Sequence, residues 1–161
     1  MNISIIGSGY VGLVSGTCLA EIGHNVICVD NNLDKINLLK HGKVPFYEPS
    51  LEPLIKYNVK EGRLSFSSEI SDGVKHSEVI FLCVGTPPMP DGSANLEYVR
   101  QVVATIAKNM DSYKLIVEKS TVPVQTGEWL GNLINNYLED KTVPYDIASN
   151  PEFLREGTAV H

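Results

Sequence analysis

The sequence predicts an α/β protein built on a doubly wound, mostly parallel sheet with helices on both faces, a three-layer α/β/α arrangement. Short runs rich in Ile and Val alternate with amphipathic patterns along all 161 residues. These runs are apolar on consecutive rather than alternate positions, as in strands that are covered on both faces. Strand–helix alternation of this kind is typical of parallel sheets. Because this length suits one domain, we assign residues 1–161 to a single domain.

The expected strands, in chain order, are Asn2–Ile6, Asn25–Val29, Leu64–Ser67, Val79–Val84, Lys114–Val117 and Asp146–Ala148. The expected helices are Tyr10–Ile22, Leu33–Lys40, Pro49–Lys60, Leu96–Met110 and Pro123–Leu138. Pro123 suits a first helical turn, because the N–H that proline lacks would have no partner there. Residues 85–95 form the longest irregular stretch, and loops of that length are often functional.

Composition excludes several classes of function. The net charge is −6 and the basic residues are scattered, which argues against a nucleic-acid or anionic-membrane partner. We see neither a signal peptide nor the roughly 18 consecutive apolar residues of a membrane helix. Cys18, Cys28 and Cys83 are odd in number and widely spaced, so they fit neither a disulfide framework nor a metal site. We therefore expect a cytoplasmic protein that binds no metal.

A glycine-rich turn follows the first expected strand, where residues 7–12 read GSGYVG and match G-x-G-x-x-G. The pattern alone is weak, but here a strand precedes it and an amphipathic helix follows it. In that setting Gly7 permits a tight turn, Gly9 lets the backbone approach a pyrophosphate, and Gly12 lets helix and strand pack closely. The amides at the start of the helix would then face the phosphates. This context favours a dinucleotide site over a purely structural turn.

Asp30 directly follows the second expected strand, 18 residues after Gly12. This is close to the spacing of the acid that binds the adenosine ribose in dinucleotide-binding folds. Its carboxylate would repel a 2′-phosphate, and the following Asn31 and Asn32 supply no arginine to bind one. The predicted cofactor is therefore NAD and not NADP. In the alternative, Asp30 only caps the helix that begins near Leu33.

Three irregular segments leave the carboxyl ends of expected strands, where ligands bind in open α/β sheets: residues 83–88, 118–123 and 149–157. Ser120 and Thr121 would contact a ligand there or, equally, cap the helix at Pro123. Glu152 and Glu156 are four residues apart and would share one face of a helix. They would lie beside a ligand or simply in solvent.

Five motifs, taken together, favour the ligand-binding interpretation of these residues. They are GSGYVG at 7–12, GTPP at 85–88, DGSANL at 91–96, KSTVP at 119–123 and NPEFLREGTAV at 150–160. In this order they resemble the N-terminal NAD-binding Rossmann domain of UDP-glucose 6-dehydrogenases, in the UDP-glucose/GDP-mannose dehydrogenase family. The last two motifs are long and specific. One departure is Asn95, where the family more often has Asp, and the two residues cap helices about equally well.

The resemblance implies a set of site residues. The implied cofactor residues are Gly7, Gly9, Tyr10, Val11, Gly12, Asp30, Lys35, Gly85, Thr86, Ser120, Thr121 and Glu156. Among these, Val11 would lie at the pyrophosphate, Asp30 and Lys35 at the adenosine ribose. The implied substrate residues are Glu152, Phe153, Leu154, Arg155 and Glu156. The implied catalytic residues are Glu152, for acid–base chemistry at the sugar C6, and Thr121, which would orient a water.

The family's reaction also implies what this chain lacks. Its members oxidise UDP-glucose at C6 to UDP-glucuronate, by two successive hydride transfers to NAD and through cysteine-bound intermediates. None of the three cysteines matches that nucleophile, and we expect them to be small core residues. The resemblance places the nucleophile, a central helix and a UDP-binding domain beyond residue 161, and makes the full-length protein a homodimer. We expect this chain to bind NAD without oxidising UDP-glucose by itself.

Other functions remain open. GDP-mannose and UDP-N-acetylmannosamine dehydrogenases share the glycine loop and the EFLRE-type segment. Tyr137 and Lys141 match the Tyr-x-x-x-Lys pair of short-chain reductases, although the glycine spacing differs there. The chain could also be a stand-alone NAD-binding or NAD-sensing module without catalysis.

Overall fold

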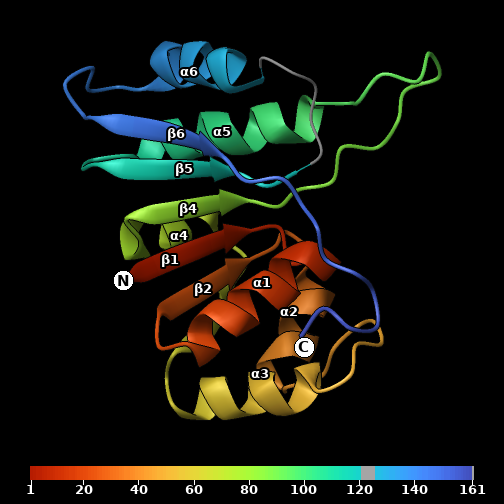
Figure 1. The fold of residues 1–161 in the computed structure, drawn as a ribbon. Helices are drawn as coiled ribbons and strands as arrows, with labels where there is room; N and C mark the ends of the chain where they lie inside the picture. The colour runs from red at the N-terminus through yellow and green to blue at the C-terminus, as the bar shows by residue number, and fades with distance from the viewer. Residues whose placement is uncertain (121–125, 161) are drawn as a thin grey trace.

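The structure, a computed structural model, describes residues 1–120 and 126–160. Its centre is a six-stranded sheet in the order β3-β2-β1-β4-β5-β6, and every neighbouring pair is parallel (Figure 1). The strands are β1 (Asn2–Ile6), β2 (Asn25–Val29), β3 (Leu64–Ser67), β4 (Val79–Leu82), β5 (Lys114–Glu118) and β6 (Tyr145–Ser149). The predicted doubly wound α/β fold is confirmed.

Helices cover both faces of the sheet (Figure 1). They are α1 (Tyr10–Glu21), α2 (Leu33–Lys40), α3 (Leu51–Lys60), α4 (Ile70–His76), α5 (Glu97–Asn109) and α6 (Thr126–Tyr137). One apolar core lies between the sheet and α1, α2 and α3, and it includes the fully buried Ile5. The other lies between the sheet and α4, α5 and α6, and it includes Leu82 and Ile116. Consecutive residues of a strand enter opposite cores, which explains the unbroken apolar runs in the sequence.

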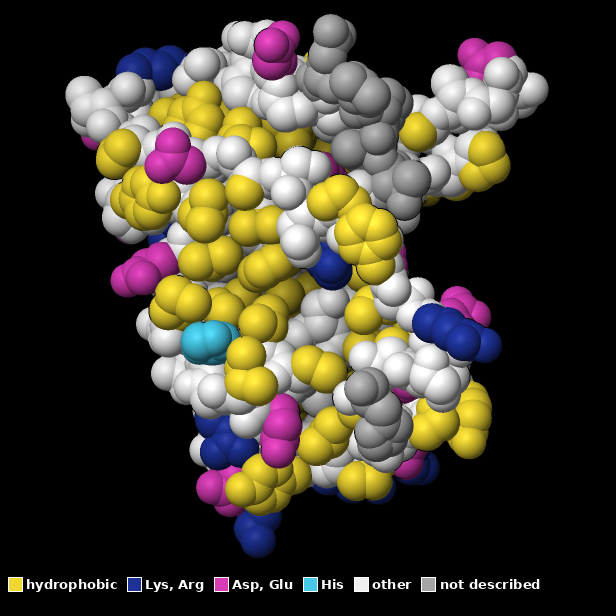
Figure 2. All heavy atoms as spheres, viewed as in Figure 1, with side chains coloured by type: hydrophobic (Ala, Val, Ile, Leu, Met, Phe, Trp, Pro, Cys, Tyr) yellow, Lys and Arg dark blue, Asp and Glu magenta, His cyan; other side chains and the backbone are white. Residues whose placement is uncertain are grey.

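The face of β4, β5 and β6 on the α1 side carries no helix in the described part of the chain. Phe81 packs at the edge of the core beneath α1, and Val79 and Leu115 lie opposite each other in the β4–β5 register. All three side chains are half-buried. Figure 2, viewed onto this face, shows hydrophobic side chains gathered over these strands. Among the described residues, no helix is long and apolar enough to cross a membrane.

The structure corrects several boundaries and adds one helix. The seven-residue α4 was not predicted, because it is short and contains Gly73, a poor helix former. Glycine allows close packing there, since a Cβ would make tight contacts, 3.1 Å from Val29 and 3.3 Å from Ser4 and Ile6 side-chain atoms. β4 ends at Leu82 and not at Val84, and α3 begins at Leu51 and not at Pro49. The predicted start of the last helix at Pro123 lies outside the described residues.

The long irregular segment at 85–95 is a narrow hairpin. Pro88 and Ala94 form an isolated antiparallel bridge, and the segment projects from the body of the molecule between β4 and α5 (Figure 1). Asn95 closes it, because its side-chain oxygen accepts the amide of Glu97 at 2.9 Å. Asn95, which stands in place of Asp, thus accepts a hydrogen bond from the first residue of α5, whose N-cap is Leu96.

Ser50, which precedes α3, is the only described non-glycine residue with a positive φ, at 67°. A left-handed conformation costs an L-residue roughly 1 kcal/mol that glycine does not lose. We expect the free energy of unfolding of Ser50→Gly to exceed that of Ser50→Ala by about 0.5–1 kcal/mol, because both variants lose the hydroxyl and only alanine keeps the backbone strain. Urea denaturation of the two variants measures this difference. A glycine variant no more stable than the alanine variant would contradict the strain.

Candidate functional site

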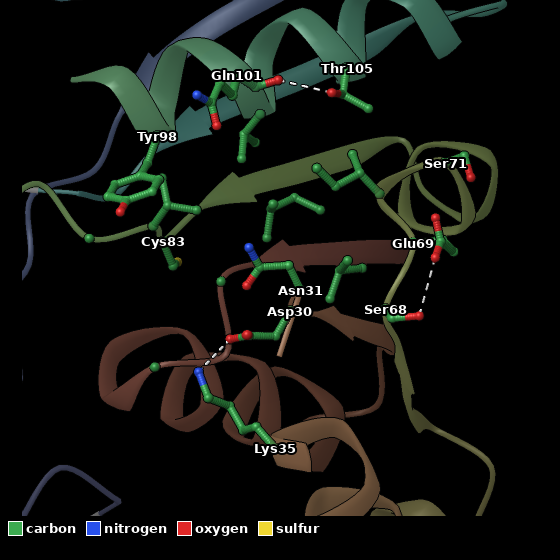
Figure 3. A pocket seen from close by; sticks show the side chains of 18 of the residues that line it. Asp30, Asn31, Lys35, Ser68, Glu69, Ser71, Cys83, Tyr98, Gln101 and Thr105 are labelled. Atoms are coloured by element: carbon green, nitrogen blue, oxygen red, sulfur yellow. Dashed lines mark hydrogen bonds and ion pairs between the residues drawn. The ribbon is translucent and has the colours of Figure 1, made fainter. Parts of the chain in front are cut away.

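A cavity of about 840 Å³ opens at the carboxyl edge of the sheet. It lies between β1 and β4, where the strand order reverses. From β1 the chain adds β2 and β3 on one side, and from β4 it adds β5 and β6 on the other. Crevices at this position hold ligands in doubly wound folds. In Figure 2 the molecule is hollowed at this edge, below the projecting hairpin, and Figure 3 shows the side chains that surround the cavity. The lining residues used below are Gly7, Gly9, Asp30, Lys35, Ser68, Glu69, Ser71, Cys83, Gly85, Tyr98, Gln101 and Thr105.

The glycine loop forms the floor of this cavity. Gly7 has φ 101°, and a Cβ there would lie 2.6 Å from the carbonyl oxygen of Cys83. A Cβ at Gly12 would lie 1.9 Å from the carbonyl oxygen of Gly7. Gly9, the N-cap of α1, differs, since a Cβ there would meet no atom within 4 Å. The backbone is therefore bare at Gly9, beside the N-terminus of α1, as an approaching phosphate requires.

Asp30 stands at the end of β2 and aims its carboxylate at the glycine loop (Figure 3). Oδ2 accepts hydrogen bonds from the amide and the hydroxyl of Ser8, both at 3.0 Å. It also pairs with Lys35 Nζ at 2.6 Å, while Oδ1 accepts the Asn32 amide at 3.0 Å. Burial alone would raise the pKa of Asp30, but these donors outweigh it and hold the pKa below its ordinary value. The carboxylate is thus ionised, as an acceptor for ribose hydroxyls must be.

Asp30 is not the cap of α2, which was the alternative for this residue. The N-cap of α2 is Asn32, whose side-chain oxygen accepts the Lys35 amide at 3.0 Å.

The structure gathers some of the expected cofactor residues and separates others. Five of them line the cavity: Gly7, Gly9, Asp30, Lys35 and Gly85. The others that are described lie outside its lining: Tyr10, Val11 and Gly12 in the first turn of α1, Thr86, Ser120 and Glu156. Thr121 lies outside the described residues. The Ser120 hydroxyl donates to the carbonyl oxygens of Val84 at 2.8 Å and Leu82 at 3.2 Å, and the helix start at Pro123 that it was predicted to cap lies outside the described residues.

Residues 150–160 have no helix or strand, so the expectation that Glu152 and Glu156 share a helix face is wrong. Pro151 near the start and Gly157, with φ 86°, favour an irregular path. The Glu152 carboxylate bonds instead to the amide of Leu154. Glu156 is exposed, and so is Phe153, at 88%. The implied substrate residues therefore form an extended segment that crosses the α1 side of the molecule (Figure 1).

Further cavity residues were missed in the sequence. Ser68, Glu69 and Ser71 come from the turn into α4, the helix that was not predicted. A polar stripe on α5, Tyr98, Gln101 and Thr105, supplies the opposite wall (Figure 3). The spacing of three and four residues on α5 is a helical-face signal that could have identified this wall. The turn at 68–71 carried no such signal.

Glu48 is the other residue that the sequence did not single out. It lies between α2 and α3 and is 6% exposed. Its carboxylate accepts the Tyr10 hydroxyl at 2.5 Å and the amides of Gly157 at 2.7 Å and Ala159 at 2.9 Å. The hydrogen bond from Tyr10 is the main reason that the pKa of Glu48 lies below its ordinary value. One carboxylate thus joins the glycine loop to the segment 150–160.

The three cysteines are free thiols. Cys28 is fully buried in β2, as expected, and burial raises its pKa. Cys83 departs from expectation, because it lies just past the end of β4 and lines the cavity. Burial raises the pKa of Cys83 to about 12, so this thiol stays protonated at neutral pH and is a poor nucleophile.

The short-chain-reductase pair does not form a site in this structure. Tyr137 ends α6 and faces the ammonium of Lys108, which lies 5.5 Å from the ring centroid. Lys141 bonds to the carbonyl oxygen of Asn135. Neither residue lines the cavity.

Glu118 ends β5 and is buried, with 3% of its surface exposed. Within the described part of the chain, neither carboxylate oxygen has a hydrogen-bond partner. Burial raises the pKa of Glu118 to about 7, and the neighbouring Ser120 offsets only part of this effect. The Ser120 hydroxyl is directed instead to the Val84 carbonyl. Glu118 is therefore partly protonated at neutral pH in the folded state.

The raised pKa of Glu118 makes the stability of the fold depend on pH. The folded pKa of Glu118 lies above the unfolded value, so the folded protein binds more protons and loses stability as the pH rises from about 4.5 to about 7. The stability of Glu118→Gln minus that of wild type should be greater at pH 8 than at pH 5, by on the order of 2 kcal/mol. Denaturant titrations across this range measure the difference. The exposed Glu139→Gln is the control, and a pH-independent difference for Glu118→Gln would refute the prediction.

The comparisons with known proteins agree with this geometry. The model of the UDP-glucose/GDP-mannose dehydrogenase family, NAD binding domain, matches residues 1–161. The UDP-glucose 6-dehydrogenase TuaD of Bacillus subtilis is 46% identical over 160 residues, which are 99% of this chain and 34% of TuaD.

Two solved structures superpose with a TM-score of 0.93, and each alignment covers 99% of this chain and 38% of the other. They are a UDP-glucose dehydrogenase from Pyrobaculum islandicum, 38% identical, and a GDP-mannose dehydrogenase from Pseudomonas aeruginosa, 39% identical. The chain spans about a third of the length of the curated relatives that it matches. A family model that covers every residue, on a Rossmann-type sheet with an acid beside a bare glycine turn, shows that this chain belongs to the UDP-glucose/GDP-mannose dehydrogenase family as its NAD-binding domain.

Proposed function

We propose that this chain holds NAD in the cavity at the carboxyl edge of the sheet and supplies the cofactor half of a UDP-glucose 6-dehydrogenase. The observation that carries the proposal is the ionised Asp30 beside the bare backbone of Gly9. The two groups match the two polar parts of an adenosine diphosphate, its ribose hydroxyls and its phosphates. The cavity they share extends to polar groups on α4 and α5.

The residues present fit this cofactor. The amides at the start of α1, among them those of Tyr10 and Val11, would face the pyrophosphate, while Asp30 would accept the ribose hydroxyls. Lys35 pairs with Asp30 at 2.6 Å and holds the carboxylate at the mouth of the cavity. Gly85 and Thr86 follow β4 at the same edge and would border the nicotinamide half, together with Ser120 and Glu156. When bound, NAD supplies an acceptor for hydride.

The substrate side of the site would be built on residues 150–160. We assign to Glu152 proton transfer at the sugar C6, and to Thr121 the orientation of a water, as the resemblance implies. Phe153 and Arg155 are exposed, and with Leu154 they are available to seat a nucleotide sugar. The chemistry assigned to the whole protein is oxidation of UDP-glucose to UDP-glucuronate in two hydride transfers. GDP-mannose or UDP-N-acetylmannosamine is the alternative substrate, because the sugar would be chosen largely outside this domain.

We infer that residues 1–161 form one such domain and that the full-length enzyme is a cytoplasmic homodimer without nucleic-acid or membrane partners. The free thiols support a reducing compartment. The net charge of −6, with scattered basic residues, argues against binding to nucleic acid.

Gly9→Ala tests the phosphate contact. A Cβ at Gly9 meets no atom within 4 Å, so we expect the variant to fold with nearly unchanged stability. The methyl group would keep a pyrophosphate from the backbone, and we expect NAD binding to weaken by tenfold or more, roughly 1.4 kcal/mol. Calorimetric titration measures the affinity. Gly127→Ala on α6, which also meets no atom within 4 Å, is the matched control and should bind NAD like wild type. Wild-type affinity in the Gly9 variant would argue against the site.

Asp30→Ala tests the ribose contact and the choice of cofactor. We expect NAD binding to weaken by about ten- to a hundredfold, since hydrogen bonds to a charged group contribute roughly 1.5–3 kcal/mol. NADP should bind wild type far more weakly than NAD, and the difference should shrink in the variant. Asp34→Ala, at an exposed acid on α2, is the control. If Asp30→Ala leaves the affinity for NAD untouched, the proposed function fails.

A further inference from the structure

Glu48 connects parts of the chain that are far apart in sequence. Its carboxylate accepts amide protons from Gly157 and Ala159, which follow it by 109 and 111 residues. The same carboxylate accepts the hydroxyl of Tyr10, which precedes it by 38 residues. Glu48 is nearly buried, at 6% exposed, so these partners and not water satisfy its oxygens.

The Tyr10 contact ties Glu48 to the glycine loop. Tyr10 is the first residue of α1 and stands directly after Gly9 in GSGYVG. Its ring packs against Phe46, two residues before Glu48, with the ring centroids 5.1 Å apart. Burial first, and then Glu48, raise the pKa of Tyr10 to about 12, so its hydroxyl remains a donor at neutral pH.

The other contacts fix the register of residues 150–160. This segment has no helix or strand. Leu154, Ala159 and Val160 pack on the core beneath α1, but apolar contacts of this kind are non-directional and permit sliding. The hydrogen bonds of two amides to one carboxylate are directional and therefore prevent the segment from sliding. Glu48 thereby determines where the residues just before Gly157, including Glu152 and Glu156, lie relative to the glycine loop.

We propose that Glu48 is a positioning residue, which holds the segment 150–160 in register against Tyr10 and so fixes the substrate-side carboxylates relative to the bound dinucleotide. The catalytic consequence of this role rests on the proposed function. The carboxylate itself lies on the α1 side of the molecule and is not part of the cavity lining. Glu48 acts on the reaction only through the segment that it holds.

Glu48→Gln is the main test, because it keeps the shape of the side chain and removes the charge that the Tyr10, Gly157 and Ala159 donors share. We expect hydrogen exchange of the 157–160 amides in this chain to speed up by about tenfold or more. In the enzyme at its full natural length we expect kcat/KM for UDP-glucose to fall by about tenfold or more, with KM for NAD changed less than about threefold. Glu48→Asp should recover part of the lost kcat/KM, because aspartate keeps the negative charge but has a shorter side chain.

Glu52→Gln is the matched control, since the Glu52 carboxylate bonds to the Val44 amide nearby but to no residue of 150–160. Wild-type exchange at 157–160 in Glu48→Gln would overturn the proposal, and so would faster exchange with unchanged kinetics. If Glu48→Gln does not fold, Glu48→Asp, which keeps the charge but shortens the side chain, should still speed exchange in this segment, and unchanged exchange would overturn the proposal. If wild type binds no NAD, the proposed function fails, while the exchange measurement still decides whether Glu48 holds the segment.

Discussion

The structure depends on the close approach of two pieces of backbone, the turn that leaves β1 and the turn that leaves β4. The Gly7 position lies so near the Cys83 carbonyl that a Cβ would come within 2.6 Å of it, and Gly12 lies closer still to Gly7. This contact lets α1 begin directly above the point where the strand order reverses. Gly7 and Gly9 of the glycine loop, the acid at the end of β2 and the polar wall from α4 and α5 then line one cavity.

Two carboxylates at the same edge of the sheet show how surroundings determine charge. Asp30 receives hydrogen bonds from backbone, hydroxyl and ammonium groups, so its pKa falls below the ordinary value despite burial. Glu118 is buried, and burial raises its pKa to about 7, with Ser120 offsetting only part of the effect. Asp30 can therefore bind a polyol as an anion, while Glu118 takes up a proton far more readily than an ordinary glutamate.

Local signals explain what the sequence could predict. β1 and β2 have the predicted bounds, because buried strands are apolar runs that end at polar or glycine residues, while β3, Leu64–Ser67, was found although its residues alternate. Gly7, Gly9 and Asp30 were also recognisable, since a glycine turn and an acid at set spacing carry a mechanism. α4 was missed because seven residues around a glycine lack a helical period. Glu48 was missed because its role comes from partners about 110 residues away, a distance that no local pattern records.

The charges of the cavity favour NAD over NADP in the proposed site. A 2′-phosphate carries up to two negative charges, and the lining offers two carboxylates, Asp30 and Glu69, against one ammonium, Lys35. That ammonium is already paired with Asp30 at 2.6 Å, so its charge is largely compensated and would attract a phosphate only weakly. Binding NADP would require Lys35 to leave Asp30 and would bring two anions together in a partly buried place. NAD needs no such exchange, because ribose hydroxyls donate to the same carboxylate that Lys35 neutralises.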